Sequence, residues 1–187
     1  MTPSQSENGV ILQKIAYSDS DEIITVLFEK SGVKKLFVKG SRASKKRFAG
    51  RIDHFQELAF QYQNKAQGLA VLQAIDELPG RFRLEAKADL LPYAYLNYFA
   101  EVVREFFWEN GQADEVYRLW QDLTAEIHAQ SFTVARAFFY TQALIRLAGY
   151  EGGGVDQTLS LRDALQFPQK ILEKPLRTLA FLQAVLV

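Results

Sequence analysis

The sequence contains no cysteine, only two histidines and no long uninterrupted run of apolar residues. Without cysteine the chain cannot form disulfides, thiolate zinc sites or a cysteine nucleophile, and a reducing compartment suits it. We expect His54 to lie in a strand and His128 at the end of a helix, so a shared metal site is not favoured. No apolar run approaches the roughly 18 residues of a spanning helix, and the polar N-terminus lacks a signal-peptide core. We therefore expect a soluble cytoplasmic protein with no membrane partner.

Sequence signatures of phosphate binding and catalysis are also missing. There is no GxxxxGK[ST] loop, and the glycines at 152–154 lack the spacing of a dinucleotide-binding turn, which favours a linker. Asp19, Asp21 and Glu22 are carboxylates that could bind a hard cation, although a turn-and-cap role is favoured. No nucleophile with a base and no pair of carboxylates for acid–base work can be assembled. The sequence thus predicts no enzymatic activity, no cofactor and no metal.

Acidic residues are absent between Lys30 and Arg51, although the whole chain has 22 acidic and 22 basic residues. The nine basic residues of this segment are Lys30, Lys34, Lys35, Lys39, Arg42, Lys45, Lys46, Arg47 and Arg51. The rest of the chain carries 13 basic and 22 acidic side chains. The net charge of zero for the whole chain therefore arises because a basic segment offsets an acidic remainder. A positive stripe on an acidic body attracts a polyanion to one face and repels it elsewhere, and nucleic acid is the first such partner to consider.

Two aromatic residues, Phe37 and Phe48, lie within this basic segment. A base stacked on an aromatic ring contributes about 1–3 kcal/mol, while each neutralised phosphate releases counterions. The segment therefore predicts a surface that binds single-stranded nucleic acid. The candidate DNA-binding residues are Lys34, Lys35, Phe37, Lys39, Arg42, Lys45, Lys46, Arg47, Phe48 and Arg51. The alternatives are a solvated charged face, with Phe37 in the core and Phe48 as a loop anchor.

The first half of the chain reads as short strands separated by turns. The expected strands span residues 9–17, 22–29, 33–39, 51–63 and 68–78, with a mobile cationic loop over 40–50. In the third strand, alternation places Leu36 and Val38 on one face and the basic residues with Phe37 on the other. A break in the alternation near Leu58 indicates a bulge in the fourth strand. Five strands fit a small closed barrel of the OB type better than a sandwich, which would need about seven.

The second half shows the 3.6-residue apolar spacing of helices, and Pro79-Gly80 separates the halves. The expected helices span residues 84–110, 114–129, 133–148, 159–167 and 176–187. The fold class is therefore α+β, with an OB-fold domain over residues 1–80 and an all-helical domain over 81–187. A pocket for an acidic, aromatic-ended peptide could form from Phe132, Phe138, Phe139, Tyr140, Arg136 and Arg146. Core packing of these aromatics against Trp108, Trp120 and Phe167 is favoured over such a pocket.

Several segments, in order, resemble the RecO family of bacterial recombination mediators over nearly the whole chain. In the first half they are Gly9-Val-Ile-Leu, Tyr17-Ser-Asp-Ser-Asp-Glu-Ile-Ile-Thr-Val-Leu-Phe28, Gly32-Val-Lys and Val38-Lys39-Gly40-Ser-Arg-Ala. Further along they are Gly68-Leu69, 74–78, Phe82-Arg-Leu, 94–101 and 137–150. No single segment is as specific as a metal-ligand motif, but the ordered set is.

The resemblance implies an OB-fold domain and a helical domain that bind single- and double-stranded DNA and promote strand annealing without a nucleotide cofactor. It implies a role in recombinational repair by the RecF pathway, with RecR as a partner, in the bacterial cytoplasm and at the nucleoid during repair. It also implies binding to the acidic, phenylalanine-ended tail of the single-strand-binding protein, and help in loading the RecA recombinase. The DNA contacts carried over by position are Lys34, Lys35, Lys39, Arg42, Lys45, Lys46 and Arg47.

The chain departs from the family pattern in two places. Many members carry a four-cysteine zinc module after the Gly-Tyr that corresponds to Gly149-Tyr150, and this chain has no cysteine. Length is missing over residues 151–167, so surfaces that longer members build there are not expected. The alternative function is a non-enzymatic OB-fold module whose basic stripe docks an acidic protein or structured RNA.

Overall fold

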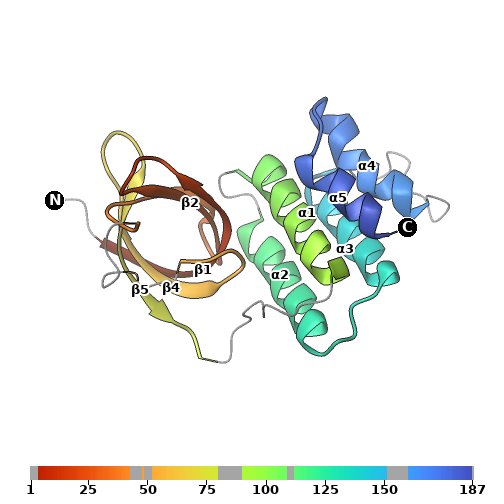
Figure 1. The fold of residues 1–187 in the computed structure, drawn as a ribbon, viewed down its shortest axis with the longest axis horizontal. Coiled ribbons are helices and arrows are strands. Elements are labelled where there is room, and N and C mark those ends of the chain that lie inside the picture. The colour runs from red at the N-terminus through yellow and green to blue at the C-terminus, as the bar shows by residue number, and fades with distance from the viewer. Residues whose placement is uncertain are drawn as a thin grey trace. The chain divides into compact units, whose positions relative to one another are not determined.

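The chain forms two compact units in a computed structural model, which describes residues 4–42, 48, 52–79, 90–108, 112–150 and 160–186. One unit comprises Met1–Leu84 with Trp108–Asp114, and the other comprises Glu85–Phe107 with Glu115–Val187. Figure 1 shows strands in the first unit and helices in the second, which confirms the α+β class. The expected domain boundary after residue 80 lies outside the described residues and stays a prediction.

The first unit is a closed five-stranded barrel (Figure 1). Its strands are β1 (Ser4–Ala16), β2 (Glu22–Phe28), β3 (Gly32–Val38), β4 (Glu57–Gln63) and β5 (Ala70–Glu77). The strands neighbour one another in the order β1-β2-β3-β5-β4, and β1 also pairs with β4 to close the ring. Only the pair β3–β5 is parallel among these ladders. This is the expected OB-type barrel, and closure gives each of these five strands a neighbour on both sides.

Alternation along β3 separates the barrel core from the outer surface. Leu36 and Val38 are fully buried in the core, whereas Lys35 and Lys39 on the opposite face are exposed, as predicted. The core cluster comprises Ile11, Ile24, Val26, Phe28, Leu36, Val38, Phe48, Ile52, Leu58, Phe60, Tyr62, Leu72 and Ile75. Because strand side chains alternate with period two, the apolar residues inside oblige the intervening lysines to face outward.

Strand β4 begins later than predicted, at Glu57 rather than residue 51. His54 and Phe55 form a turn, and Phe55 has a φ of 64°, a left-handed conformation that interrupts an extended strand. The prediction that His54 lies in a strand was therefore wrong. The ladder between β4 and β5 shifts register between Gln61 and Tyr62, and the extra residue is Gln73 of β5, because Gln61 pairs with Ala74 and Tyr62 with Leu72. The bulge predicted near Leu58 of the fourth strand is therefore not seen, and the irregularity lies in β5.

The second unit consists of five described helices, α1 (Leu90–Phe106), α2 (Ala113–His128), α3 (Val134–Leu147), α4 (Leu161–Leu172) and α5 (Arg177–Val185). Helix α4 was expected to end at Phe167, but it continues through Pro168. Proline cannot donate the bond that would reach Ala164, and its burial against the other helices compensates for that loss. None of the described helices has the length and apolar character needed to cross a membrane.

Buried tyrosines bind the helices together. The Tyr95 hydroxyl lies 3.0 Å from the Thr141 hydroxyl, and the Tyr98 hydroxyl donates to the Leu165 carbonyl at 2.9 Å. Burial raises the pKa of Tyr98 well above its ordinary value, so this hydroxyl remains a donor. These bonds satisfy polar atoms that would otherwise destabilise an apolar core.

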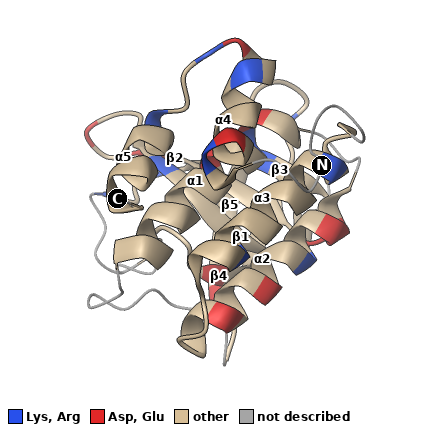
Figure 2. Cartoon of the chain, turned by 90° about the vertical axis from the view of Figure 1, so that its right-hand side faces the viewer, with Lys and Arg blue, Asp and Glu red and all other residues tan. Residues whose placement is uncertain are grey.

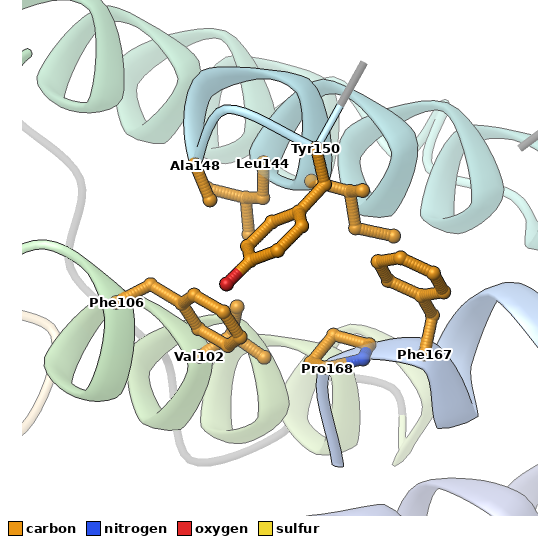
Figure 3. A pocket seen from close by; sticks show the side chains of 8 residues that line it. Val102, Phe106, Leu144, Ala148, Tyr150, Phe167 and Pro168 are labelled. Atoms are coloured by element: carbon orange, nitrogen blue, oxygen red, sulfur yellow. The ribbon is translucent and has the colours of Figure 1, made fainter. Parts of the chain in front are cut away.

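Tyr150 closes the end of α3 against its neighbours (Figure 3). Its ring makes edge-on contacts with Phe106 and Phe167, each at 6.0 Å between centroids. The cavity beside these rings has a volume of only about 10 Å³. Such a space holds about one water molecule, so this part of the helical unit is packed core rather than a ligand site.

Gly9 offers a sharp test of barrel packing. A Cβ atom at this position would lie 2.6 Å from Val26 Cγ1, 2.9 Å from Phe28 Cδ1 and 3.0 Å from the Leu27 carbonyl oxygen. We expect Gly9→Ala to lower the free energy of unfolding by about 1–3 kcal/mol, because overpacking a dense core forces neighbours to move. Ser6→Ala, an exposed position on the same strand, is the control for denaturant melts. Equal midpoints for the two variants would contradict this packing.

Candidate nucleic-acid interface

The outer face of β3 carries most of the described candidates. Lys35 and Lys39 are exposed, and Phe37 between them is partly exposed. Across the ladder to β2, Phe37 lies opposite Ile23. Ile23 in turn lies opposite Ile15 of β1, whose side chain is 47% exposed. The arrangement is an apolar and aromatic strip with cations on both sides of it.

Tyr17 extends the aromatic part of this surface. Its ring meets that of Phe37 edge-on, with centroids 5.6 Å apart, and its side chain is 66% exposed. Sequence reasoning placed Tyr17 in the first strand but did not name it as a binding residue. The pairing register of the strands could have identified Tyr17 as a surface residue. Because β1 and β3 both pair with β2, the ring that follows β1 and the ring of Phe37 come to the same face.

The turn after β1 holds the end of β3 in place. The Asp21 carboxylate accepts hydrogen bonds from the Gly40 amide at 2.8 Å and from the hydroxyls of Ser18 and Ser20. The Gly40 bond holds the pKa of Asp21 below its ordinary value, with smaller contributions from the two hydroxyls and nearby positive charge. The turn-and-cap role predicted for Asp21 is confirmed. Among the described residues, no group of three potential ligands could hold a metal ion.

Arg42 is anchored to the same turn. Its amide donates to the Ser20 carbonyl at 3.1 Å, and one guanidinium nitrogen donates to the Ser18 carbonyl at 2.8 Å. The partner atoms are backbone oxygens, so the cation keeps its full positive charge while its position is restricted. The side chain is exposed. Arg42 and Lys39 therefore lie together at the end of β3, beside the Tyr17–Phe37 pair.

Two other candidates lie toward the barrel interior. Lys34 shares the parity of Leu36, and its ammonium donates to the Tyr62 hydroxyl at 3.4 Å and lies 5.5 Å from the centre of that ring. Phe48 is 2% exposed and belongs to the barrel core. Its ring has no face available for a base, so the loop-anchor alternative fits it better and we leave it out of the interface. Lys45, Lys46, Arg47 and Arg51 lie outside the described residues and stay predictions.

Trp108 belongs to the barrel unit, although it follows a helix of the other unit in sequence. It forms an isolated parallel bridge with Val33 of β3, and the Lys35 ammonium lies 4.9 Å from the centre of its ring. The expectation that Trp108 packs with the helical aromatics was wrong. Its neighbours in sequence carry a helical pattern, so nothing local indicated this position.

The barrel sequence matches a known family. Residues 1–78 match the family model described as Recombination protein O N terminal. The similarity to this family therefore lies in the part of the chain that contains the five barrel strands.

Proteins named DNA repair protein RecO are similar over longer stretches. The protein from Anaeromyxobacter sp. (strain K) is 30% identical over 112 residues, which cover 59% of this chain and 43% of that protein. The protein from Myxococcus xanthus is 26% identical over 124 residues, which cover 66% of this chain and 50% of that protein. The protein from Staphylococcus aureus is 26% identical over 123 residues, which cover 66% of this chain and 48% of that protein. The chain thus spans about half the length of the RecO relatives it matches.

Beyond the RecO N-terminal match, the helical unit has an open groove of about 360 Å³ between α2 and α3. Its lining residues are Glu115, Arg118, Leu119, Asp122, Phe139, Ala143, Arg146 and Leu147. Figure 2 colours residues of both signs along α2. Of the aromatics proposed for a peptide pocket, Phe139 lines this groove and is 48% exposed, whereas Tyr140 is buried. The rings of Phe132 and Tyr95 pack together with their centroids 5.3 Å apart, as predicted by the alternative in which these aromatics form the core.

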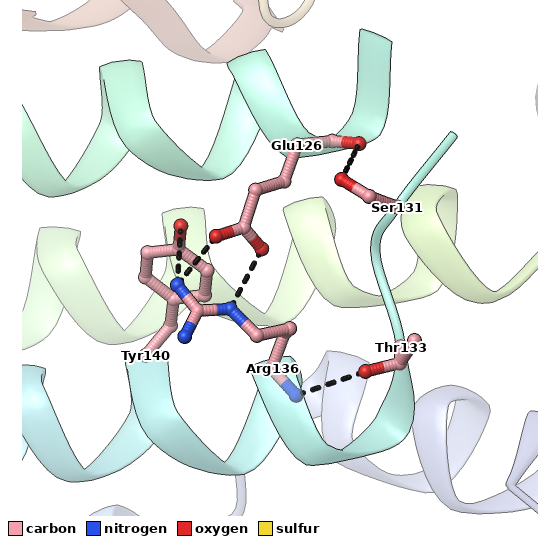
Figure 4. Close-up of polar contacts among 5 residues, drawn as sticks. All are labelled: Glu126, Ser131, Thr133, Arg136 and Tyr140. Carbon is pink, nitrogen blue, oxygen red and sulfur yellow. Dashed lines mark hydrogen bonds and ion pairs between the residues drawn. The ribbon is translucent and has the colours of Figure 1, made fainter. Parts of the chain in front are cut away.

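Arg136, also proposed for that pocket, is engaged beside the groove (Figure 4). Its guanidinium donates to both carboxylate oxygens of Glu126 and lies 4.3 Å from the centre of the Phe139 ring. It also donates to the Tyr140 hydroxyl at 3.5 Å. The Arg136 hydrogen bonds hold the pKa of Glu126 below its ordinary value, while burial raises the pKa of Tyr140 to about 12. Arg136 therefore fixes one wall of the groove.

The Glu126–Arg136 pair predicts a specific acid sensitivity. Because the folded state lowers the pKa of Glu126 from 4.5, its stabilising contribution is complete above that value and is lost as the pH falls through the folded-state pKa. Glu126→Gln should lower the melting temperature at neutral pH and flatten its decline between about pH 5 and pH 3. Asp122→Asn, which removes an exposed carboxylate from the same helix, is the control. A decline as steep in Glu126→Gln as in the wild type would contradict the assignment.

Proposed function

We propose that this chain is a DNA-binding recombination mediator in DNA repair, with the outer face of β1–β3 as its DNA surface. It binds single- and double-stranded DNA, promotes annealing of complementary strands and helps load a recombinase in the RecF pathway, in the bacterial cytoplasm and at the nucleoid during repair. The observation that carries the proposal is the outward placement of Lys35 and Lys39 on either side of Phe37, with Tyr17 against it. The RecO relatives, named as DNA repair proteins, support the same role.

The charges of the barrel surface remain available for phosphates. Between described residues, the ion pairs are Arg136–Glu126 and Lys174–Glu105, both in the helical unit. Within the described part of the barrel, no carboxylate therefore forms an ion pair with Lys35 or Lys39. A phosphate backbone that binds there releases counterions, which is the main source of salt-dependent affinity for nucleic acids.

Annealing then follows from the same two features. Cations screen the repulsion between two polyanionic strands, and ring faces hold bases unpaired and accessible to a complementary strand. The proposed activity makes and breaks no covalent bond, so the chain needs neither a catalytic residue nor a nucleotide cofactor. The predicted loop cations Lys45, Lys46 and Arg47 would add to the same screening.

The salt dependence of binding tests this surface. The double substitution Lys35→Ala with Lys39→Ala should weaken single-strand binding about equally for all sequences. It should also reduce the slope of log affinity against log salt by about 0.7 for each phosphate that the variant no longer neutralises. The measurement is fluorescence anisotropy of labelled oligonucleotides over a salt series, followed by an annealing assay with complementary strands.

A matched control removes two exposed cations from helix α4, through Arg162→Ala with Lys170→Ala. This variant should keep the wild-type slope. If both double variants have the same slope, the cations of β3 do not contact phosphates. If the wild type ignores oligonucleotides at low ionic strength but binds an acidic protein, the alternative function as a docking module replaces the present one.

The groove between α2 and α3 supports a second role, binding of the single-strand-binding protein through its acidic, phenylalanine-ended tail. Phe139 and Leu147 offer an apolar surface to an aromatic end group, and the exposed Arg146 beside them suits a carboxylate. Glu115 and Asp122 at the rim would restrict the register of an acidic peptide by repulsion. We also propose RecR as a partner, on the similarity to the RecO family alone and without assigned residues.

The tail site is tested with a synthetic acidic peptide that ends in phenylalanine. Arg146→Ala should weaken its binding about tenfold or more, because a hydrogen bond to a charged group contributes about 1.5–3 kcal/mol. Phe139→Ala should also weaken it, whereas Phe181→Ala, an equally simple loss of an exposed ring on α5, should not. The measurement is calorimetric titration of the full chain. Equal affinities for all variants would exclude this groove.

A further inference from the structure

Trp108 is the exposed one of the two tryptophans. Its side chain is 44% exposed, whereas Trp120 is fully buried in the helical unit. A tryptophan that served only as a packing anchor would bury its large ring, as Trp120 does. The exposure of Trp108 therefore leaves ring surface accessible to a ligand at the barrel.

The ring lies in line with the proposed DNA surface. Trp108 bridges Val33, and the outward side chains that follow along β3 are Lys35, Phe37 and Lys39. Each two-residue step along a strand advances about 6.6 Å. The outer side of β3 thus presents an aromatic ring, a cation, the Tyr17–Phe37 pair and a second cation in alternation.

Such an alternation matches the chemistry of an unpaired strand. Bases and phosphates also alternate along it, and successive rings, two steps apart, are separated by about 13 Å, roughly four times the 3.4 Å rise of stacked bases in a duplex. Bases bound at successive rings would be unstacked from one another. Duplex DNA, whose bases are paired and stacked, could use the cations but not the rings.

We propose that Trp108 is a base-stacking residue of the single-strand surface, with Lys35 holding its ring on one side and contacting the adjacent phosphate. The inference rests on the proposed function and assigns a residue to it that lies outside the basic segment. Cation–π contact with Lys35 keeps the indole against β3 without covering it entirely. Trp108 therefore contributes to the affinity for single strands more than to that for duplexes.

Intrinsic fluorescence provides the first test on the unmodified chain. Stacking of a base on Trp108 should quench its emission when an unlabelled thymidine oligonucleotide of about 16 nucleotides is added. The buried Trp120 serves as an internal reference that the oligonucleotide does not reach. Trp108→Phe should remove the quenching while retaining most of the affinity, because the smaller ring still stacks.

Substitution provides the second test. Trp108→Ala should weaken single-strand binding by about 5- to 150-fold and leave the salt slope unchanged, because stacking energy carries no counterion release. Lys35→Gln should instead reduce the slope. Phe181→Ala, which removes an exposed ring from α5, is the matched control and should change neither affinity nor slope. Duplex binding should be nearly the same for Trp108→Ala and the wild type.

The outcomes separate this inference from the proposed function. Wild-type binding with a steep salt slope, but without quenching of Trp108 and with full affinity in Trp108→Ala, overturns the stacking role and leaves the DNA surface standing. Absence of any oligonucleotide binding at low salt overturns both. If thermal melts show that Trp108→Ala is unfolded, the wild-type quenching and the affinity of Trp108→Phe decide the question.

Discussion

The period of two along β3 is the constraint on which the proposed surface depends. Leu36 and Val38 must point into the barrel to complete its core, so Lys35, Phe37 and Lys39 must point away from it. A slip of one residue would bury two ammonium groups and expose two aliphatic side chains. The hydrophobic core thus fixes the register that places cations and an aromatic ring on one outer face, and stability and binding share one cause.

Contacts from outside β3 complete that face. The Asp21 carboxylate bonds the Gly40 amide, and Arg42 bonds backbone oxygens of the same turn, so the end of β3 is held where β1 turns into β2. At the other end of β3, Trp108 bridges Val33. The candidate surface is therefore built from segments far apart in sequence, and no single stretch of basic residues defines it.

Local patterns in the sequence were sufficient for the barrel, the helices and the outward lysines, because alternation and helical spacing are local properties. They were insufficient where distant contacts decide. From the sequence, Phe48 was equally suited to stacking on a base and to anchoring a loop, and only the structure shows that it lies in the barrel core. Tyr17 lies on the surface because strand register brings its ring against Phe37, which the local sequence does not show. Trp108 follows a helical segment in sequence but pairs with Val33 of β3. The positive φ of Phe55, which shortens β4, depends likewise on its bond to Ile11 across the barrel.

The central claim, that the outer face of β1–β3 binds nucleic acid, is tested most directly by NMR titration of the isotope-labelled chain with a short single-stranded oligonucleotide. The account predicts that the amide signals of Tyr17, Lys35, Phe37 and Lys39 shift together and saturate, with smaller shifts for core residues such as Leu36. Shifts confined to the helical unit, or none at low salt, would contradict it.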